Sequence, residues 1–255
     1  MSNLFSVGGK RALVTGGTRG IGRAICDLFL AQGAELMVVA RTVDELQQRL
    51  SDWRDLGGKV EGIVADVSTS EGRWHIIHSV RAHWDRLDVF VNCAGTNIRK
   101  KSVDYSIEEF RHILDTNATA AFELTRHLHA LLAAAHGASV VLIGSTAGLS
   151  TVPTGAPYAM SKAALDQLTR YLAVEWAQDG IRVNSVAPWY IRTPLVEGVL
   201  ANRAYYDTVL SRTPMGRIGE PIEVAAVTAF LCASAASFVT GQTIAVDGGF
   251  LAKGM

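Results

Sequence analysis

Two hydrophobic periodicities alternate along the chain. Short apolar runs rich in β-branched residues predict strands buried on both faces, and longer stretches with apolar residues every three or four positions predict helices. The predicted strands are Arg11–Val14, Leu36–Ala40, Val60–Val64, Val89–Val91, Val140–Ile143, Val183–Val186 and Thr243–Val246. The predicted helices are Gly22–Gln32, Val43–Leu56, Glu71–Trp84, Ile107–Ala134, Tyr158–Gln178 and Ile222–Ala235.

The alternation of strand and helix predicts an α/β fold with a parallel sheet and right-handed crossovers. Seven strands in 255 residues fit one doubly wound, Rossmann-type sheet with helices on both faces and ligands at the carboxyl ends of its strands. No linker or repeat divides the chain, so residues 1–255 are predicted to form a single domain. The irregular stretch Pro188–Thr213 is too long for an ordinary connection and is predicted to be a substrate loop or lid, with a decorative insertion as the alternative.

Composition narrows the function classes. Charged residues make up 19% of the chain and cancel to a formal net charge of zero, which argues against nucleic acid or an anionic membrane as partner. The N-terminus lacks a signal-peptide pattern, and no apolar run reaches the roughly 18 residues of a membrane span. Cys26, Cys93 and Cys232 are odd in number and form no CxxC pair, so we expect buried thiols in a reducing compartment, and a cytoplasmic protein.

A glycine-rich turn, Thr15–Gly22, follows the first predicted strand and opens the first helix. Gly16 permits the sharp turn, Gly20 lets the backbone approach a pyrophosphate, and Gly22 lets helix and strand pack closely. The free N–H groups at the helix N-terminus favour an anion. This context predicts a dinucleotide site, to which the turn also contributes Thr18, Arg19 and Ile21.

The end of the second predicted strand indicates which dinucleotide binds. Enzymes that take NAD place an acid there, whereas this chain has Arg41. Arg41 and Arg19 predict a two-sided clamp on a 2′-phosphate, hence NADP(H), with two solvated surface arginines as the alternative. Asp66 is predicted to accept a hydrogen bond from the adenine amino group. The predicted site continues with Val67, with Asn92, Ala94 and Gly95 after the fourth strand, and with Pro188, Ile191 and Thr193 after the sixth.

Three polar residues point to chemistry at the same edge of the sheet. Ser145 follows the fifth predicted strand, and Tyr158 and Lys162 lie four apart on one helix face. A nearby cation favours the phenolate, so Lys162 is expected to lower the Tyr158 pKa from about 10. Tyr158 would then donate a proton to a carbonyl being reduced, or accept one from an alcohol being oxidised. By itself, a tyrosine and a lysine four residues apart usually have no catalytic role and simply share a helix face. Ser145 and the dinucleotide-binding turn favour a catalytic role for this pair.

Other polar clusters give weaker evidence for a functional site. His75, His78 and Glu71 share a helix face but offer three ligands where a structural zinc needs four, so no metal site is predicted. The run Arg99–Lys101 is placed to meet an anionic substrate, but a solvated loop is the favoured interpretation. Cys93 lies near the predicted cofactor and far from any base, so a nucleophilic role is not expected.

These motifs stand in the order of the short-chain dehydrogenase/reductase family, which the chain resembles over essentially its whole length. The motifs that carry the resemblance are Thr15–Gly22, Asn92–Gly95, Asn117, Ser145, Tyr158-x-x-x-Lys162 and Ile244–Gly249. Within the family the chain is most similar to the tropinone-reductase-like group, through Gly95–Lys100 and Val186–Pro194.

The resemblance implies a role for each of four residues. Tyr158 would be the acid or base, and Lys162 would lower its pKa and hold the nicotinamide ribose. Ser145 would steady the substrate oxygen, and Asn117 would anchor a water relay through a local break in its helix. Independently of the family, asparagine is a poor helix former, so a local reason for Asn117 in mid-helix is expected.

The chain departs from the family pattern at two positions. Cys93 replaces the usual second asparagine of its motif, a change we expect to be tolerated. Trp189 replaces a glycine that commonly follows the proline, and is expected either to turn inward and narrow the substrate cavity or to turn outward and pin the loop Tyr190–Leu200. The candidate substrate residues are mostly apolar and are Ile98, Ser145, Thr146, Val152, Trp189, Leu195, Val196 and Leu200.

The function predicted is NADPH-dependent reduction of a ketone or aldehyde to an alcohol, with Tyr158 as general acid. The alternatives are NAD(P)-dependent alcohol oxidation and a catalytically silent dinucleotide-binding redox sensor. The helices Ile107–Ala134 and Tyr158–Gln178 carry more apolar positions than one sheet face needs. With Ile244–Leu251 they are expected to form self-complementary interfaces, and the resemblance implies a homotetramer, or else a homodimer.

Overall fold

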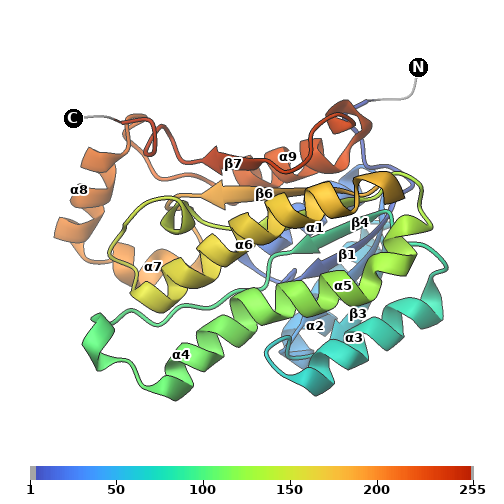
Figure 1. The fold of residues 1–255 in the computed structure, drawn as a ribbon, viewed down its shortest axis with the longest axis horizontal. Helices are drawn as coiled ribbons and strands as arrows, with labels where there is room; N and C mark the ends of the chain where they lie inside the picture. Colours follow the sequence, from blue (N-terminus) through green and yellow to red (C-terminus); the bar gives the residue numbers. More distant parts are fainter. Residues whose placement is uncertain (1–3, 254–255) are drawn as a thin grey trace.

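The computed structural model describes residues 4–253, which contain one sheet of seven parallel strands (Figure 1). The strands are β1 (Arg11–Thr15), β2 (Glu35–Ala40), β3 (Lys59–Val64), β4 (Val89–Asn92), β5 (Ser139–Ile143), β6 (Arg182–Pro188) and β7 (Thr243–Val246), so all seven predicted strands are confirmed. Their order is β3-β2-β1-β4-β5-β6-β7. The order reverses between β1 and β4, and ligands of such sheets bind at the carboxyl ends beside that point.

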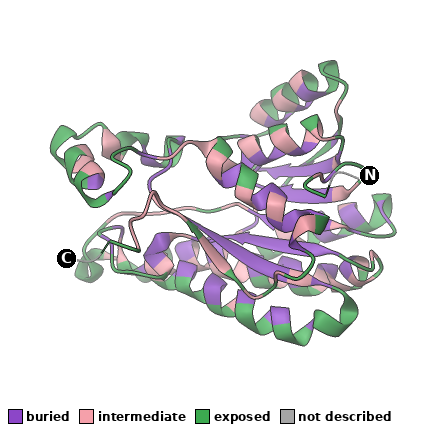
Figure 2. Cartoon of the chain, turned by 90° about the horizontal axis from the view of Figure 1, so that it is seen from above, coloured by how far each residue is buried: buried purple, intermediate pink, exposed green. Residues whose placement is uncertain are grey.

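Helices cover both faces of the sheet. The helices α1 (Gly20–Ala31), α2 (Val43–Asp55) and α9 (Pro221–Cys232) pack on one face, and α3 (Ser70–His83), α5 (Ala120–Ala133) and α6 (Ala156–Glu175) on the other. In β1, Leu13 packs into the α3–α5–α6 layer, whereas Ala12 and Val14 pack into the α1–α2–α9 layer. Both strand faces are therefore apolar, and Figure 2 shows the buried strands between helices whose outer faces are exposed.

A local break divides the helix expected over Ile107–Ala134. Helix α4 (Ile107–Leu114) begins at a capping box, in which the Ser106 hydroxyl accepts from the Glu109 backbone N–H at 3.2 Å. A π-helical turn over Asp115–Thr119 then joins α4 to α5. The turn contains Asn117, the residue at which a break was expected.

The segment after β6 is more regular than expected. Pro188–Thr213 contains two helices, α7 (Pro194–Leu200) and α8 (Arg203–Arg212), which lie at the carboxyl end of the sheet (Figure 1). Pro194 begins α7, and the Asn202 side chain caps α8 by accepting from the Tyr205 backbone N–H at 3.1 Å. Their apolar side chains form a small cluster apart from the sheet core, so the segment gives only a weak amphipathic signal.

Four single turns of 3-10 helix complete the secondary structure of the described chain, at Ser102–Asp104, Thr146–Gly148, Ala177–Asp179 and Ser234–Ala236. Within residues 4–253 no helix has both the length and the hydropathy to cross a membrane. No group of three or more metal-ligating side chains converges in the same residues.

Candidate active site

The glycine turn between β1 and α1 is built for close approach of backbone. Gly16 has φ +70° and Gly20 has φ +55°, in the region that favours glycine. A Cβ at Gly16 would lie 2.9 Å from Cα of Ala94, and one at Gly22 would lie 2.1 Å from the carbonyl oxygen of Gly16. No side chain caps the N-terminus of α1 and no acid occupies its first turn. Its N–H groups are therefore open to an anionic ligand.

The predicted chemical residues meet at the carboxyl edge of the sheet. Ser145 follows β5, and its hydroxyl accepts from the Ala147 backbone N–H at 3.1 Å. Tyr158 lies in the first turn of α6 and lines the same two cavities as Ser145, whose side chain lowers the Tyr158 pKa by hydrogen bonding. One turn later, Nζ of Lys162 lies 5.7 Å from the centroid of the Tyr158 ring and donates to the carbonyl oxygen of Ile143 at 2.8 Å.

The environment of Tyr158 corrects one expectation. Burial raises the pKa of Tyr158 above its ordinary value, although the hydrogen bond with Ser145 and the charge of Arg99 oppose the rise. The expected lowering by Lys162 is therefore wrong for this structure. The Lys162 ammonium lies over the ring and is bonded to Ile143, whereas loss of water acts directly on the phenol. The phenol stays protonated at neutral pH.

Lys162 itself is shifted by burial. Loss of water lowers its pKa from 10.5 to about 8, and the nearby Cys93 and Asp166 oppose that shift. Lys162 is thus charged at neutral pH and loses its charge in moderately alkaline solution. Burial also raises the pKa of Cys93 to about 12, so this thiol is protonated and unsuited to nucleophilic attack.

Asn117 is fully buried in the π-helical turn and bonded through both side-chain polar atoms. Its Nδ2 donates to the Thr96 carbonyl at 3.0 Å and to the Ser161 hydroxyl at 2.9 Å, and its Oδ1 accepts from the Thr96 N–H at 2.8 Å. These bonds tie the loop after β4 to α6. A Cβ at Gly95 in that loop would lie 3.6 Å from Nζ of Lys162. Asn117 therefore positions the loop beside Lys162, and its water relay stays a prediction.

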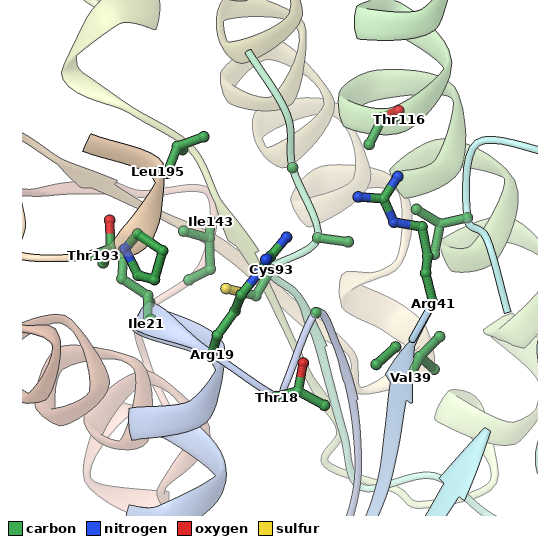
Figure 3. A pocket seen from close by; sticks show the side chains of 18 of the residues that line it. Thr18, Arg19, Ile21, Val39, Arg41, Cys93, Thr116, Ile143, Thr193 and Leu195 are labelled. Atoms are coloured by element: carbon green, nitrogen blue, oxygen red, sulfur yellow. The ribbon is translucent and has the colours of Figure 1, made fainter. Parts of the chain in front are cut away.

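The opposite end of the site carries positive charge. Figure 3 shows Arg19 and Arg41 projecting into the pocket from the turn before α1 and from the end of β2. Nη1 of Arg41 lies 3.9 Å from Oδ2 of Asp66. Burial raises the pKa of Asp66, but hydrogen bonds from Ser68 and the charge of Arg41 outweigh it and hold that pKa below its ordinary value. Asp66 therefore remains an ionised acceptor.

A cleft of about 470 Å³ joins these two ends. The glycine turn, both arginines, Ser145, Tyr158 and Lys162 all line it. Arg41 follows β2 and Ser145 follows β5, and the glycine turn after β1 lies between them in the strand order. The shape, the open helix N-terminus and the flanking charges fit a dinucleotide with its pyrophosphate on the turn.

Comparison with known proteins agrees with this geometry. Residues 16–251 match the family model described as enoyl-(acyl carrier protein) reductase. A tropinone reductase homolog of Arabidopsis thaliana is 47% identical over 251 residues, covering 98% of this chain and 95% of the relative. A tropinone reductase homolog of Datura stramonium is 42% identical over 254 residues, covering 98% and 95%. One solved structure is described as an NAD(P)-dependent gluconate 5-dehydrogenase from Beutenbergia cavernae, with NADP bound at low occupancy. It is 36% identical to this chain with a TM-score of 0.94, and the match covers 98% of this chain and 100% of that chain.

The chain belongs to the short-chain dehydrogenase/reductase family. The resemblance found in its motifs is therefore confirmed, as is its similarity to tropinone reductases. As a member of this family, with NADP-bound structural relatives, the protein is an NAD(P)-dependent oxidoreductase that uses a nicotinamide dinucleotide.

Most residues predicted for the cofactor of this short-chain dehydrogenase/reductase line the cleft. They are Gly16, Thr18, Arg19, Gly20, Ile21, Gly22, Arg41, Asp66, Val67, Ala94, Gly95, Tyr158, Lys162, Pro188, Ile191 and Thr193. Asn92 does not line it: its side chain is buried and accepts from the Thr15 hydroxyl at 3.2 Å, which in turn accepts from the backbone N–H groups of Cys93 and Ala94. Sequence reasoning missed Glu45, an acid that lines the cleft from the first turn of α2.

A second cavity, of about 40 Å³, adjoins the cleft at the chemical residues, and we name it the side cavity. It shares Ser145, Tyr158, Trp189, Leu195 and Val196 with the cleft, and adds Asn97, Arg99, Thr146, Val152, Thr154 and Tyr190. Sequence reasoning missed Asn97, Thr154 and Tyr190, and it favoured a solvated Arg99. The expected lining was mostly apolar, whereas the side cavity has a largely polar lining.

Two predicted substrate residues line neither cavity. The Ile98 carbonyl accepts a hydrogen bond from the Tyr105 hydroxyl, which holds the loop, and Leu200 packs on the apolar cluster of α7 and α8. Trp189 both narrows the substrate space and packs against neighbouring segments, the two roles that we had considered as alternatives. It lines both cavities, yet its ring stacks on Phe250 at 3.7 Å between centroids and its Nε1 donates to the Thr213 hydroxyl at 3.0 Å.

Proposed function

We propose that the protein reduces a ketone or aldehyde to an alcohol with NADPH, using Tyr158 as general acid. The observation that carries the proposal is the paired Ser145 and Tyr158 hydroxyls at the junction of the two cavities. A cofactor in the cleft and a substrate in the side cavity would meet there. The reverse oxidation of an alcohol is the alternative, and a catalytically silent redox sensor is a weaker one.

The nicotinamide supplies a hydride to the carbonyl carbon when the dinucleotide is bound. Tyr158 donates its hydroxyl proton to the carbonyl oxygen, and the Ser145 hydroxyl donates a hydrogen bond to the same oxygen as negative charge develops there. The pKa of Tyr158 lies above its ordinary value, so the phenol is protonated at neutral pH and has a proton to donate. Lys162 would hold the nicotinamide ribose through its ammonium group.

The preference for NADP(H) rests on Arg19 and Arg41. Both arginines line the cleft, after the neighbouring strands β1 and β2, and each would donate charge-assisted hydrogen bonds to a 2′-phosphate. Asp66 would accept from the adenine amino group. Glu45, in the first turn of α2, also lines the cleft and would repel the phosphate, so the arginines would have to outweigh its charge.

The reaction is tested by comparing Tyr158→Phe with the unmodified protein on a panel of ketones and aldehydes. NADPH binding, followed by its fluorescence, should remain nearly unchanged, while turnover falls by about 10²-fold or more. A variant that kept most of its turnover would show that Tyr158 is not the acid. Ser145→Ala serves as a partner variant, because it removes one hydrogen bond and leaves the proton donor in place.

We also infer that residues 1–255 act as one domain, in the cytoplasm, as a homotetramer or homodimer. Exposed apolar side chains on the outer faces of α5 and α6 support the assembly: Phe122 is 47% exposed, Tyr171 65% and Val174 81%. A second copy of the chain packed on these helices would bury them.

A further inference from the structure

The side cavity contains polar atoms that the described chain leaves unpaired. They are Nδ2 and Oδ1 of Asn97, Nε of Arg99 and Oγ1 of Thr154. All four atoms are buried and lack a hydrogen-bond partner within residues 4–253. Buried polar atoms are costly to leave unpaired, so their convergence beside Tyr158 indicates that a polar ligand completes the cavity.

The cavity also carries an uncompensated positive charge. Arg99 lines it, and no Asp or Glu of the described residues does. Its neighbour Lys100 forms a salt bridge with Glu109 away from the cavity, whereas Arg99 forms none with any residue from 4 to 253. The two neighbouring cations therefore have different environments. Lys100 is neutralised by Glu109 outside the side cavity, whereas the charge of Arg99 faces the side cavity and is available to a ligand.

Arg99 lies close to the reacting group. Burial raises the pKa of both Tyr158 and Tyr190, and the charge of Arg99 opposes that rise at each hydroxyl. Arg99 also opposes it at Tyr190 through a side-chain hydrogen bond, so its unpaired donor is Nε. The Tyr190 hydroxyl is also 2.5 Å from that of Tyr205. Because Arg99 and Tyr158 line the same cavity of about 40 Å³, an anion bound by Arg99 would lie close to a carbonyl at Tyr158.

We propose that the substrate is an oxo acid, in which a carboxylate bound by Arg99, Asn97 and Thr154 lies a few carbon atoms from the reduced carbonyl. This inference rests on the proposed carbonyl reduction and names its substrate class. The planar guanidinium matches a carboxylate, and the Asn97 amide and the Thr154 hydroxyl add donors. A cavity of about 40 Å³ admits a compact group of a few heavy atoms.

Matched acids and esters test the inference, because methylation removes the charge and keeps the carbon chain. The pairs are pyruvate, acetoacetate and levulinate with their methyl esters, which vary the distance between carboxylate and carbonyl. In the unmodified protein, kcat/KM should be about tenfold or more higher for at least one acid than for its ester. Arg99→Met should lower kcat/KM for that acid by about 10- to 100-fold and change the ester far less, since charge-assisted hydrogen bonds are lost only with the acid.

Two further variants control for structural damage. Lys100→Met removes the neighbouring charge outside the cavity and should leave the acid-to-ester ratio unchanged. Arg99→Lys keeps a charge but not the planar fork, and should recover part of the preference for the acid. Equal losses for acid and ester in Arg99→Met, or a preference of the unmodified protein for every ester, would overturn the inference.

A binding measurement separates this inference from the proposed function. Calorimetric titration of the same three acids into the protein saturated with NADP⁺ should show binding that Arg99→Met weakens by about tenfold or more. Reduction of neutral ketones without carboxylate binding would overturn the oxo-acid substrate and leave the carbonyl reductase intact. Binding that depends on Arg99 without reduction of any carbonyl compound would support the anion site and refute the reductase. Carboxylates that neither bind nor react would overturn the oxo acid.

Discussion

Replacing Lys162 by methionine is expected to stabilise the protein without bound cofactor at neutral pH. The Lys162 side chain is buried, and burial lowers its pKa from 10.5 to about 8. That lowering of the pKa corresponds to about 3 kcal/mol by which protonated lysine destabilises the folded state. Methionine carries no charge but leaves the Ile143 carbonyl without the hydrogen bond from Nζ, at a cost of about 1–2 kcal/mol. The free energy of unfolding should therefore rise by about 1–2 kcal/mol at pH 7.

The pH dependence of this gain is a sharper test than its size. Between the two pKa values the unfolded chain binds more protons at Lys162 than the folded protein does, so the unmodified protein gains stability as pH rises from about 8 towards 10.5. The variant lacks this titration. Its advantage should therefore shrink by about 2 kcal/mol between about pH 7 and pH 9.5.

Reversible urea unfolding, followed by tryptophan fluorescence at several pH values, measures the difference between the two proteins. Met160→Leu on the same helix is a control without a titrating group, and its difference from the unmodified protein should not vary with pH. Lys162→Met should also lose about 10²-fold or more in turnover. A stability difference independent of pH, or a variant less stable than the unmodified protein at pH 7, would refute the reasoning from burial.

Three other predictions follow from the site. The unmodified protein should favour NADPH over NADH by roughly two orders of magnitude in kcat/KM, and Arg41→Asp should erase or invert that ratio; equal values for both cofactors would exclude the arginine clamp. Trp189→Gly should lower kcat/KM for compact and bulky ketones alike by about tenfold or more, because the stack on Phe250 is lost; a gain confined to bulky ketones would contradict this. Light scattering at micromolar concentration should report a multiple of the 27.3 kDa chain mass, and a monomer would refute the assembly.

Several features were predictable because they depend on residues close together in the chain. The strands are apolar on both faces, so their runs mark a sheet covered by helices. The turn Thr15–Gly22 and the spacing of Tyr158 and Lys162 carry their geometry within one or two helical turns. The helices α7 and α8 also had local signals, in Pro194 and in the Asn202 cap, but both are short and pack apart from the sheet, so their periodicity was weak.

The properties of the site depended instead on residues far apart in the sequence. Lys162 was expected to lower the Tyr158 pKa because the pair was read alone, whereas burial by the surrounding fold reverses the sign. Arg99 stood in a basic run that resembled a solvated loop. Folding brings Arg99 together with Thr154 and Tyr190, and separates it from Lys100, which pairs with Glu109. Spacing along the chain was enough to propose which residues carry chemistry. Desolvation and uncompensated charge arise only when distant segments pack, so the direction of the Tyr158 pKa shift and the charge of the side cavity were decided by the tertiary structure.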